Sequence, residues 1–252
     1  MNYLYICRIE DYLSVPELPE VDYNFFRDRW TPGTCQWILA HEAFTSWVED
    51  SHQKPRTLWV HGNAASGKSI LSSFVIDHIV QFGTSSCYFF IRFTDQKKRG
   101  LSMMLRSLAS QLAYMILSYA EKLRQLESAA TDLKTADARN LWQWLFRQTL
   151  FRLSVDEPIY CVIDGIDEAE SPGSAVKLLS DLHLTTVPLR ILIVSRKTHE
   201  ISTAFQKLAK QVHMESICTH GNLHDLRAHI EHEMDISSEE EYREQVNYQP
   251  AA

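Results

Sequence analysis

A glycine-rich stretch at residues 62–69 carries the residue types best suited to chemistry. It reads G-N-A-A-S-G-K-S, which matches the pattern G-x-x-x-x-G-K-[ST], and it lies between a strand-like and a helix-like run. Glycines let a backbone approach a polyphosphate without Cβ clashes, and loop N–H groups with a helix N-terminus form a positive cradle. Lys68 would reach the β- and γ-phosphates, and the Ser69 hydroxyl would ligate Mg²⁺. The pattern predicts a nucleoside-triphosphate site formed by Gly62, Asn63, Ala64, Ala65, Ser66, Gly67, Lys68, Ser69 and Ile70.

The alternative for this stretch is a chance match, because loops of glycine, alanine and serine before a helix are common. A second acidic motif reduces the weight of that alternative. Residues 159–168 read I-Y-C-V-I-D-G-I-D-E, so an apolar run delivers Asp164 to the C-terminal end of a strand. Ligands bind at that end in open α/β sheets. We therefore expect Asp164 to bind Mg²⁺, through water.

Asp167 and Glu168 follow in the next turn. Either could orient or activate an attacking water, and we favour Glu168 as the base with Asp167 as the second candidate. The alternative is a surface loop of acids that cap a turn. Three acids so close in sequence would repel one another unless a cation lay among them, which favours the functional interpretation.

Arg196 is the last candidate, directly after the apolar run 189–194 and Ser195. An arginine at the end of a strand beside the acid-bearing strand could contact a γ-phosphate and report its hydrolysis. The equal alternative is a surface arginine that pairs with a neighbouring helix. We therefore count Arg196 with Asp167 and Glu168 as candidate catalytic residues.

The elements that must position these residues alternate between strands and helices. Helical patterns separate the strand-like runs, and this alternation indicates a parallel sheet covered on both faces. We predict an α/β fold, a P-loop NTPase three-layer sandwich with a mainly parallel five-stranded sheet covered by helices on both faces. The expected strands are 57–61, 86–93, 159–163, 189–194 and 211–215. The expected later helices are 68–82, 102–126, 139–153, 174–184, 198–210 and 223–234.

The 252 residues fit one large domain with appendages. Residues 1–29 contain prolines and several acids, and we expect an irregular N-terminal extension there. Residues 30–234 hold both motifs and all the expected strands, so they are assigned to the NTPase domain. Residues 235–252 are polar and acidic, and we expect a tail that frays.

Composition excludes several classes of function. The net charge of −7 argues against a dedicated nucleic-acid partner, which would require a basic stripe. No apolar run approaches the ~18 residues that cross a membrane. Arg8, Glu10 and Asp11 interrupt any apolar signal-peptide core. The five cysteines are scattered without a C-x-x-C pair, which indicates a reducing compartment, and we expect a cytoplasmic protein without structural zinc.

With both motifs in hand, the chain resembles the NACHT domain of STAND P-loop NTPases. It is most similar to the nephrocystin-type NACHT modules of fungal NOD-like receptors and heterokaryon-incompatibility proteins. The resemblance covers about residues 30–234. It rests on the lead-in G-T-C-Q-W-I-L-A-H-E-A-F-T-S-W-V, the loop H-G-N-A-A-S-G-K-S, the acidic motif V-I-D-G-I-D-E-A and the run I-L-I-V-S-R.

This resemblance implies an ATP or GTP switch that uses Mg²⁺, hydrolyses slowly and acts in signal transduction and innate immunity. It implies homo-oligomerisation or binding to other NACHT proteins as the partner interaction. Family members carry an effector before this domain, and a lid and repeats after it. We expect the present chain to be a truncated form, because it shows neither. The alternative functions are a non-hydrolysing nucleotide-binding or protein-interaction scaffold and, without support from an acceptor-binding lid, a phosphotransferase.

Overall fold

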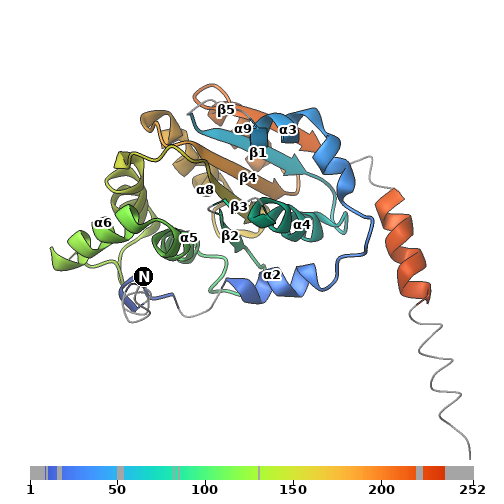
Figure 1. The fold of residues 1–252 in the computed structure, drawn as a ribbon, viewed down its shortest axis with the longest axis horizontal. Coiled ribbons are helices and arrows are strands. Elements are labelled where there is room, and N and C mark those ends of the chain that lie inside the picture. The colour runs from blue at the N-terminus through green and yellow to red at the C-terminus, as the bar shows by residue number, and fades with distance from the viewer. Residues whose placement is uncertain are drawn as a thin grey trace, which may run out of the picture.

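A five-stranded sheet forms the centre of the described residues (Figure 1). The computed structural model describes residues 9, 11–15, 19–49, 54–81, 83–84, 86–129, 131–219 and 224–235. All neighbouring strands pair in parallel, in the order β2-β3-β4-β1-β5. The strands are β1 (Arg56–His61), β2 (Ser86–Phe90), β3 (Ile159–Asp164), β4 (Leu189–Ser195) and β5 (His213–Cys218).

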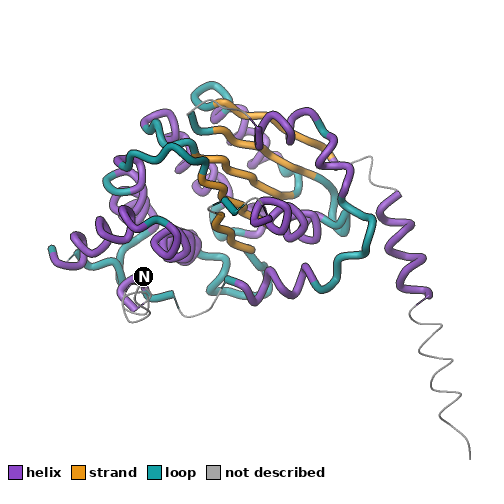
Figure 2. Tube along the Cα trace, in the orientation of Figure 1, coloured by secondary structure: helices purple, strands orange, loops and turns teal. Residues whose placement is uncertain are grey.

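Helices surround the sheet on both faces (Figure 2). The α-helices are α2 (Glu20–Arg27), α3 (Glu42–Glu49), α4 (Lys68–Gln81), α5 (Leu101–Met115), α6 (Leu117–Ser128), α7 (Ala138–Leu141), α8 (Pro172–Leu178), α9 (His199–Leu208) and residues 224–235. The shorter turns are η1 (Gln36–Ala40), η2 (Trp142–Arg147), η3 (Leu150–Arg152), η4 (Ile166–Glu168) and η5 (Leu179–Leu184). Among the described residues, none of these helices combines the length and the apolarity that a membrane crossing requires.

Alternating side chains of the central strands supply two separate cores. On β1, Leu58 and Val60 pack with the apolar residues of α3 and α4, whereas Trp59 faces the other layer and stacks on Phe205 of α9 at 4.4 Å. Successive strand side chains point to opposite faces, so a strand that is buried throughout must be covered on both. The β3 and β4 strands are buried along their whole length. The predicted three-layer α/β sandwich is therefore confirmed.

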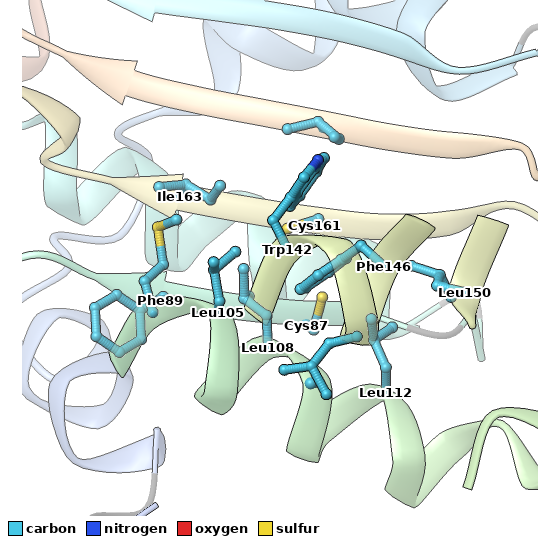
Figure 3. Packing of buried hydrophobic residues seen from close by; sticks show 14 of the residues in the cluster. Cys87, Phe89, Leu105, Leu108, Leu112, Trp142, Phe146, Leu150, Cys161 and Ile163 are labelled. Carbon is cyan, nitrogen blue, oxygen red and sulfur yellow. The ribbon is translucent and has the colours of Figure 1, made fainter. Parts of the chain in front are cut away.

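The larger core lies between the sheet and α5 (Figure 3). Trp142 and Phe146 come from the π-helical turn η2 and stack with their ring centroids 4.8 Å apart. They pack with Leu108 of α5 against Cys87 and Cys161, which are paired neighbours on β2 and β3. Both cysteines are free and buried, so they act as small apolar residues of the core, as their place in apolar runs predicts.

Two predicted long helices are interrupted. The helix expected over 102–126 breaks at Ile116, which has extended backbone angles of φ −116° and ψ 99°. The break redirects α6 so that Tyr119 is fully buried and its hydroxyl donates to the carbonyl of Leu145 at 2.8 Å. The helix expected over 139–153 is replaced by α7, η2 and η3, and the Thr149 hydroxyl donates to the carbonyls of Trp144 and Leu145 near its end. Core packing and local side-chain hydrogen bonds outweigh helix periodicity at both places.

The irregular extension expected over residues 1–29 is wrong for Glu20–Arg27, which form α2. This helix packs on the domain: Phe26 stacks on Phe90 of β2 at 5.2 Å, and the Tyr23 hydroxyl donates to the carboxylate of Asp77 on α4. The domain limits 30–234 stay a prediction, and α2 shows that contacts of the domain extend before residue 30. The polar tail expected at 235–252 lies outside the described residues, apart from residue 235 at the end of the last helix.

Candidate functional site

The predicted phosphate loop connects β1 to α4. Ala65 and Gly67 have left-handed backbones, with φ of 56° and 72°, and these two residues turn the chain so that α4 starts at Lys68. Gly62 packs against the end of β5, where a Cβ atom would lie 1.9 Å from the Thr219 hydroxyl oxygen. A glycine is therefore required at 62 for close approach and suits 67 for its backbone angle.

Lys68 and Ser69 begin the helix that follows the loop. The Lys68 ammonium donates to the Asn63 carbonyl and lies 3.4 Å from the Ser66 hydroxyl oxygen. Burial lowers the pKa of Lys68, and the nearby Asp164 and Asp167 carboxylates act in the opposite direction. A half-buried ammonium that contacts neutral oxygens suits a site where an anion completes its environment.

Asp164 occupies the predicted end of β3, beside α4. Its two carboxylate oxygens accept hydrogen bonds from the hydroxyls of Ser69, at 2.6 Å, and Ser72, at 2.9 Å. Burial raises the pKa of Asp164 to about 6, although both hydroxyls and Lys68 lower it. Sequence analysis missed Ser72, and the available signal was its spacing: a residue three positions after Ser69 lies on the same helix face.

Gly165 separates Asp164 from the following acids, and its backbone is left-handed with φ of 76°. A Cβ atom at this position would lie 2.6 Å from the carbonyl oxygen of Ile91. The turn after β3 can therefore approach the end of β2 only because residue 165 has no side chain.

We expect Gly165→Ala to lower the free energy of unfolding by more than the ~1–3 kcal/mol typical of a left-handed non-glycine residue, because a backbone clash adds to it. Gly83→Ala is the matched control, since Gly83 has φ of 67° and nothing within 4 Å of its added Cβ. Urea unfolding of both variants measures the difference. Equal losses in the two variants would show that the end of β2 moves to accommodate the methyl group.

Arg196 connects the two remaining acids. Its backbone N–H donates to Asp167 at 3.0 Å, and its guanidinium lies 3.4 Å from the Asp167 carboxylate and 3.5 Å from that of Glu168. Glu168 also accepts a hydrogen bond from the backbone N–H of Phe93 at 2.7 Å. Asp167 is the more buried of the two carboxylates, with 6% of its side chain exposed against 28% for Glu168. Glu168 is thus the more accessible acid.

One pocket of about 270 Å³ collects these groups. Of the predicted site residues, Gly62 and Asn63 do not line it: Gly62 packs against Thr219, and Asn63 holds Lys68 through its carbonyl. Three lining residues that no motif marked, Phe26, Ile91 and Arg92, come from α2 and from the end of β2. The complete lining is Phe26, Ala64, Ala65, Ser66, Gly67, Lys68, Ser69, Ile70, Ile91, Arg92, Asp164, Gly165, Asp167, Glu168 and Arg196.

A second pocket of about 430 Å³ opens on the other side of the loop and shares Ala65, Gly67 and Ile70 with the first. Its walls are residues 29–35 and the helix of residues 224–235. Two contacts join these walls. The Asp225 carboxylate accepts a hydrogen bond from the backbone N–H of Cys35 at 2.7 Å, and Thr31 Oγ1 lies 2.9 Å from His229 Nδ1. Sequence analysis did not assign this pocket, because its walls lie about 190 residues apart in the chain.

The comparison with curated proteins finds a fungal relative. The chain is 25% identical over 196 residues to the vegetative incompatibility protein HET-E-1 of Podospora anserina. The match covers 73% of this chain and 14% of that protein, so the chain spans a small part of its relative's length.

Solved structures with related topology belong to replication initiators. The Aeropyrum pernix ORC1 protein in complex with DNA matches with a TM-score of 0.45 and 9% identity, over 88% of this chain and 53% of that one. Domain III of the Thermotoga maritima replication initiation protein DnaA matches with a TM-score of 0.35 and 13% identity, over 78% of this chain and 67% of that one. The P-loop NTPase fold assigned here rests on the strand order and the phosphate loop rather than on these scores.

The family comparison agrees with the motifs on which the site is built. The family model described as nephrocystin 3, N-terminal matches residues 33–196, more than half of the chain. The matched segment begins in the lead-in, contains the phosphate loop and the acidic motif, and ends at Arg196. The resemblance to nephrocystin-type NACHT modules is confirmed, and the chain belongs to the nephrocystin 3 N-terminal family of P-loop NTPase-type modules.

Proposed function

We propose that this chain binds a nucleoside triphosphate, ATP or GTP, with Mg²⁺, and that it acts as a slowly hydrolysing switch module in a NOD-like-receptor type of signalling protein. The observation that carries the proposal is the convergence of Lys68, Ser69 and Asp164 in one pocket with Glu168 and Arg196. A cationic loop, a hydroxyl with a carboxylate, and a second acid beyond them are the groups that phosphoryl transfer requires.

Ser69 and Asp164 fit a magnesium site. Their oxygens lie 2.6 Å apart, and the Asp164 carboxylate is buried. Mg²⁺ keeps several waters and takes few protein ligands when a nucleotide supplies the rest. Among the described residues, no group of three or more histidine, cysteine, aspartate or glutamate residues is arranged to hold a metal, which suits such a sparse ligand set. Bound there, the ion would neutralise phosphate charge.

The adjoining pocket supports a place for the base and ribose. It is larger than the phosphate pocket and meets it at Ala65, Gly67 and Ile70. Its lining offers hydroxyls and charged groups at Thr31, Thr34 and Asp225 that could orient a base. In this arrangement the phosphates would run along the loop from the larger pocket toward Asp164.

Hydrolysis is assigned to Glu168, which would accept a proton from the attacking water. Asp167 is occupied by the backbone N–H and the guanidinium of Arg196, so its role is to hold that arginine beside the terminal phosphate. The contact between Arg196 and Glu168 at 3.5 Å would let the arginine respond when the phosphate leaves. Self-association or binding to other NACHT proteins is the partner interaction proposed for the switch. Nucleic acid is not proposed as a partner, because the net charge is −7.

We expect Glu168→Gln to reduce phosphate release by about 10²–10⁴-fold while nucleotide affinity is retained, because the amide cannot accept the proton. Single-turnover phosphate release and equilibrium titration measure the two properties separately. Glu170→Gln is the matched control, since Glu170 is exposed and lines neither pocket. Release at the wild-type rate in Glu168→Gln would exclude Glu168 as the base. A wild-type protein that binds nucleotide and releases no phosphate would favour the non-hydrolysing scaffold.

A further inference from the structure

We propose that Arg92 is a second cationic ligand of the terminal phosphate, oriented for this role by α2. This inference rests on the proposed triphosphate site and adds a residue that lies outside both sequence motifs. The observation behind it is that Arg92 lines the same pocket as Lys68 and Asp164, although it comes from the opposite side of the acid-bearing strand.

The position of Arg92 follows from the pairing of β2 with β3. Phe90 pairs with Asp164, and the backbone N–H of Ile91 donates to the Asp164 carbonyl at 2.9 Å. The chain after β2 therefore stays beside the acidic motif, and Arg92 is the next residue. The backbone N–H of Phe93 then donates to the Glu168 carboxylate, which fastens this loop to the acid beyond Asp164.

The Arg92 side chain is held at the pocket by residues of α2. Its Nε lies 3.2 Å from the Asp22 carboxylate, and its guanidinium lies over the rings of Phe25 at 4.8 Å and Phe26 at 4.6 Å. The helix is itself anchored, because the Tyr23 hydroxyl donates to Asp77 on α4, the helix that follows the phosphate loop. Two aromatic faces and one carboxylate define the guanidinium orientation and reduce the entropy it would lose on binding.

The contacts of Arg92 leave its binding capacity unused. Asp22 contacts the guanidinium through Nε, and within the described parts of the chain the two terminal amino groups have no hydrogen-bond partner. A guanidinium presents five N–H donors in a planar fork that matches phosphate oxygens. Arg196 differs, because both acids of the motif already contact its guanidinium. Arg92 is therefore the better prepared of the two arginines to receive a phosphate.

The location of Arg92 also specifies which phosphate it would contact. Arg92 and Asp164 line the pocket at the acidic motif, and neither lines the adjoining larger pocket. With the base in the larger pocket, Arg92 lies at the end of the phosphate chain farthest from the base. It should then stabilise a triphosphate much more than a diphosphate, which would make it a determinant of the nucleotide state that the switch recognises.

Titration of the full chain with Mg-ATP, Mg-ADP, Mg-GTP and Mg-GDP tests this inference. We expect Arg92→Ala to weaken triphosphate binding by about tenfold or more, as for other charge-assisted contacts, and diphosphate binding by less than about twofold. Arg92→Lys should recover part of the triphosphate affinity, because the charge remains without the fork. Lys97→Ala is the matched control for a positive charge lost from the same loop, since Lys97 lines neither pocket.

Equal weakening for triphosphate and diphosphate, or a change no larger than that of Lys97→Ala, would overturn the role of Arg92. Should Arg92→Ala fail to fold, Arg92→Gln and Arg92→Lys carry the same test, and wild-type triphosphate selectivity in a folded Arg92→Gln would overturn it equally. Failure of this inference is separable from failure of the proposed function. If the wild-type protein binds triphosphate and Lys68→Ala does not, the site stands whatever Arg92 does; if the wild-type protein binds no nucleotide, both proposals fall.

Discussion

Lys68→Ala is expected to abolish the stabilisation of the protein by Mg-ATP or Mg-GTP. A ligand that binds only the native state adds about 2.7 kcal/mol to the free energy of unfolding at a hundredfold excess over its dissociation constant. Loss of one charge-assisted contact to phosphate removes about 1.5–3 kcal/mol of binding free energy, so most of this stabilisation should disappear. Thermal unfolding with and without each nucleotide measures the effect and identifies the preferred base.

The structure separates this binding defect from a folding defect. In the protein without nucleotide, the Lys68 ammonium contacts only the Asn63 carbonyl and the Ser66 hydroxyl, and burial lowers its pKa. The alanine variant should therefore unfold at nearly the same temperature as the wild type when no nucleotide is present. Lys207→Ala, on the far layer at α9, controls for the loss of a lysine charge. A Lys68→Ala variant that keeps its full shift with nucleotide would refute the assignment of this loop.

Asp164→Asn should stabilise the nucleotide-free protein above pH 6 and abolish the Mg²⁺ dependence of nucleotide binding. The folded-state pKa of Asp164 is raised from 3.8 to about 6, so the folded protein holds this proton more tightly than the unfolded chain. The free energy of unfolding must then fall as the pH rises from about 4 to about 6, and the loss persists at higher pH. A shift of about two pKa units corresponds to roughly 3 kcal/mol at most. Asparagine removes this cost because it does not ionise.

Urea unfolding between pH 4.5 and 7.5 measures the difference between the variant and the wild type. The difference should grow with pH up to about 6 and then stay constant, whereas exposed Asp156, changed to asparagine as a control, should give no such trend. Nucleotide binding should show the opposite demand, since Mg²⁺ requires the ionised carboxylate. Affinity of the wild type for Mg-nucleotide should therefore rise through pH 6. Parallel pH curves for Asp164→Asn and the wild type would show that this carboxylate is not destabilised by burial.

The candidate site was largely predictable where its chemistry depends on residues close in sequence. The phosphate loop needs two glycines, a lysine and a hydroxyl within eight positions, because one continuous backbone turn must surround the phosphates. The acidic motif needs a carboxylate at the end of a buried strand, and parallel strands bring such ends to the same edge of the sheet. The structure accordingly joins Ser69 and Asp164 by a hydrogen bond across 95 residues of chain.

The remaining parts of the site could not be predicted in this way, because their positions depend on packing between distant segments. Ser72 carries no motif, and it becomes a partner of Asp164 only because α4 lies against β3. Arg92 was an ordinary charged residue after a strand until α2, expected to be irregular, proved to hold its guanidinium at the pocket. The long helices expected over 102–126 and 139–153 break where burial of Tyr119, Trp142 and Phe146 is worth more than continued helix periodicity.

The sequence by itself determined the fold class, the loop that can hold phosphates and the acids that can hold a metal, since each depends on local pattern and on strand ends. Only the tertiary structure decided which further residues surround those groups. The wall of the larger pocket is the clearest case: the contact between Cys35 and Asp225 joins segments 190 residues apart, and no local pattern encodes it. Backbone geometry is set within a few residues, whereas the lining of a pocket is set by the packing free energy of the whole domain.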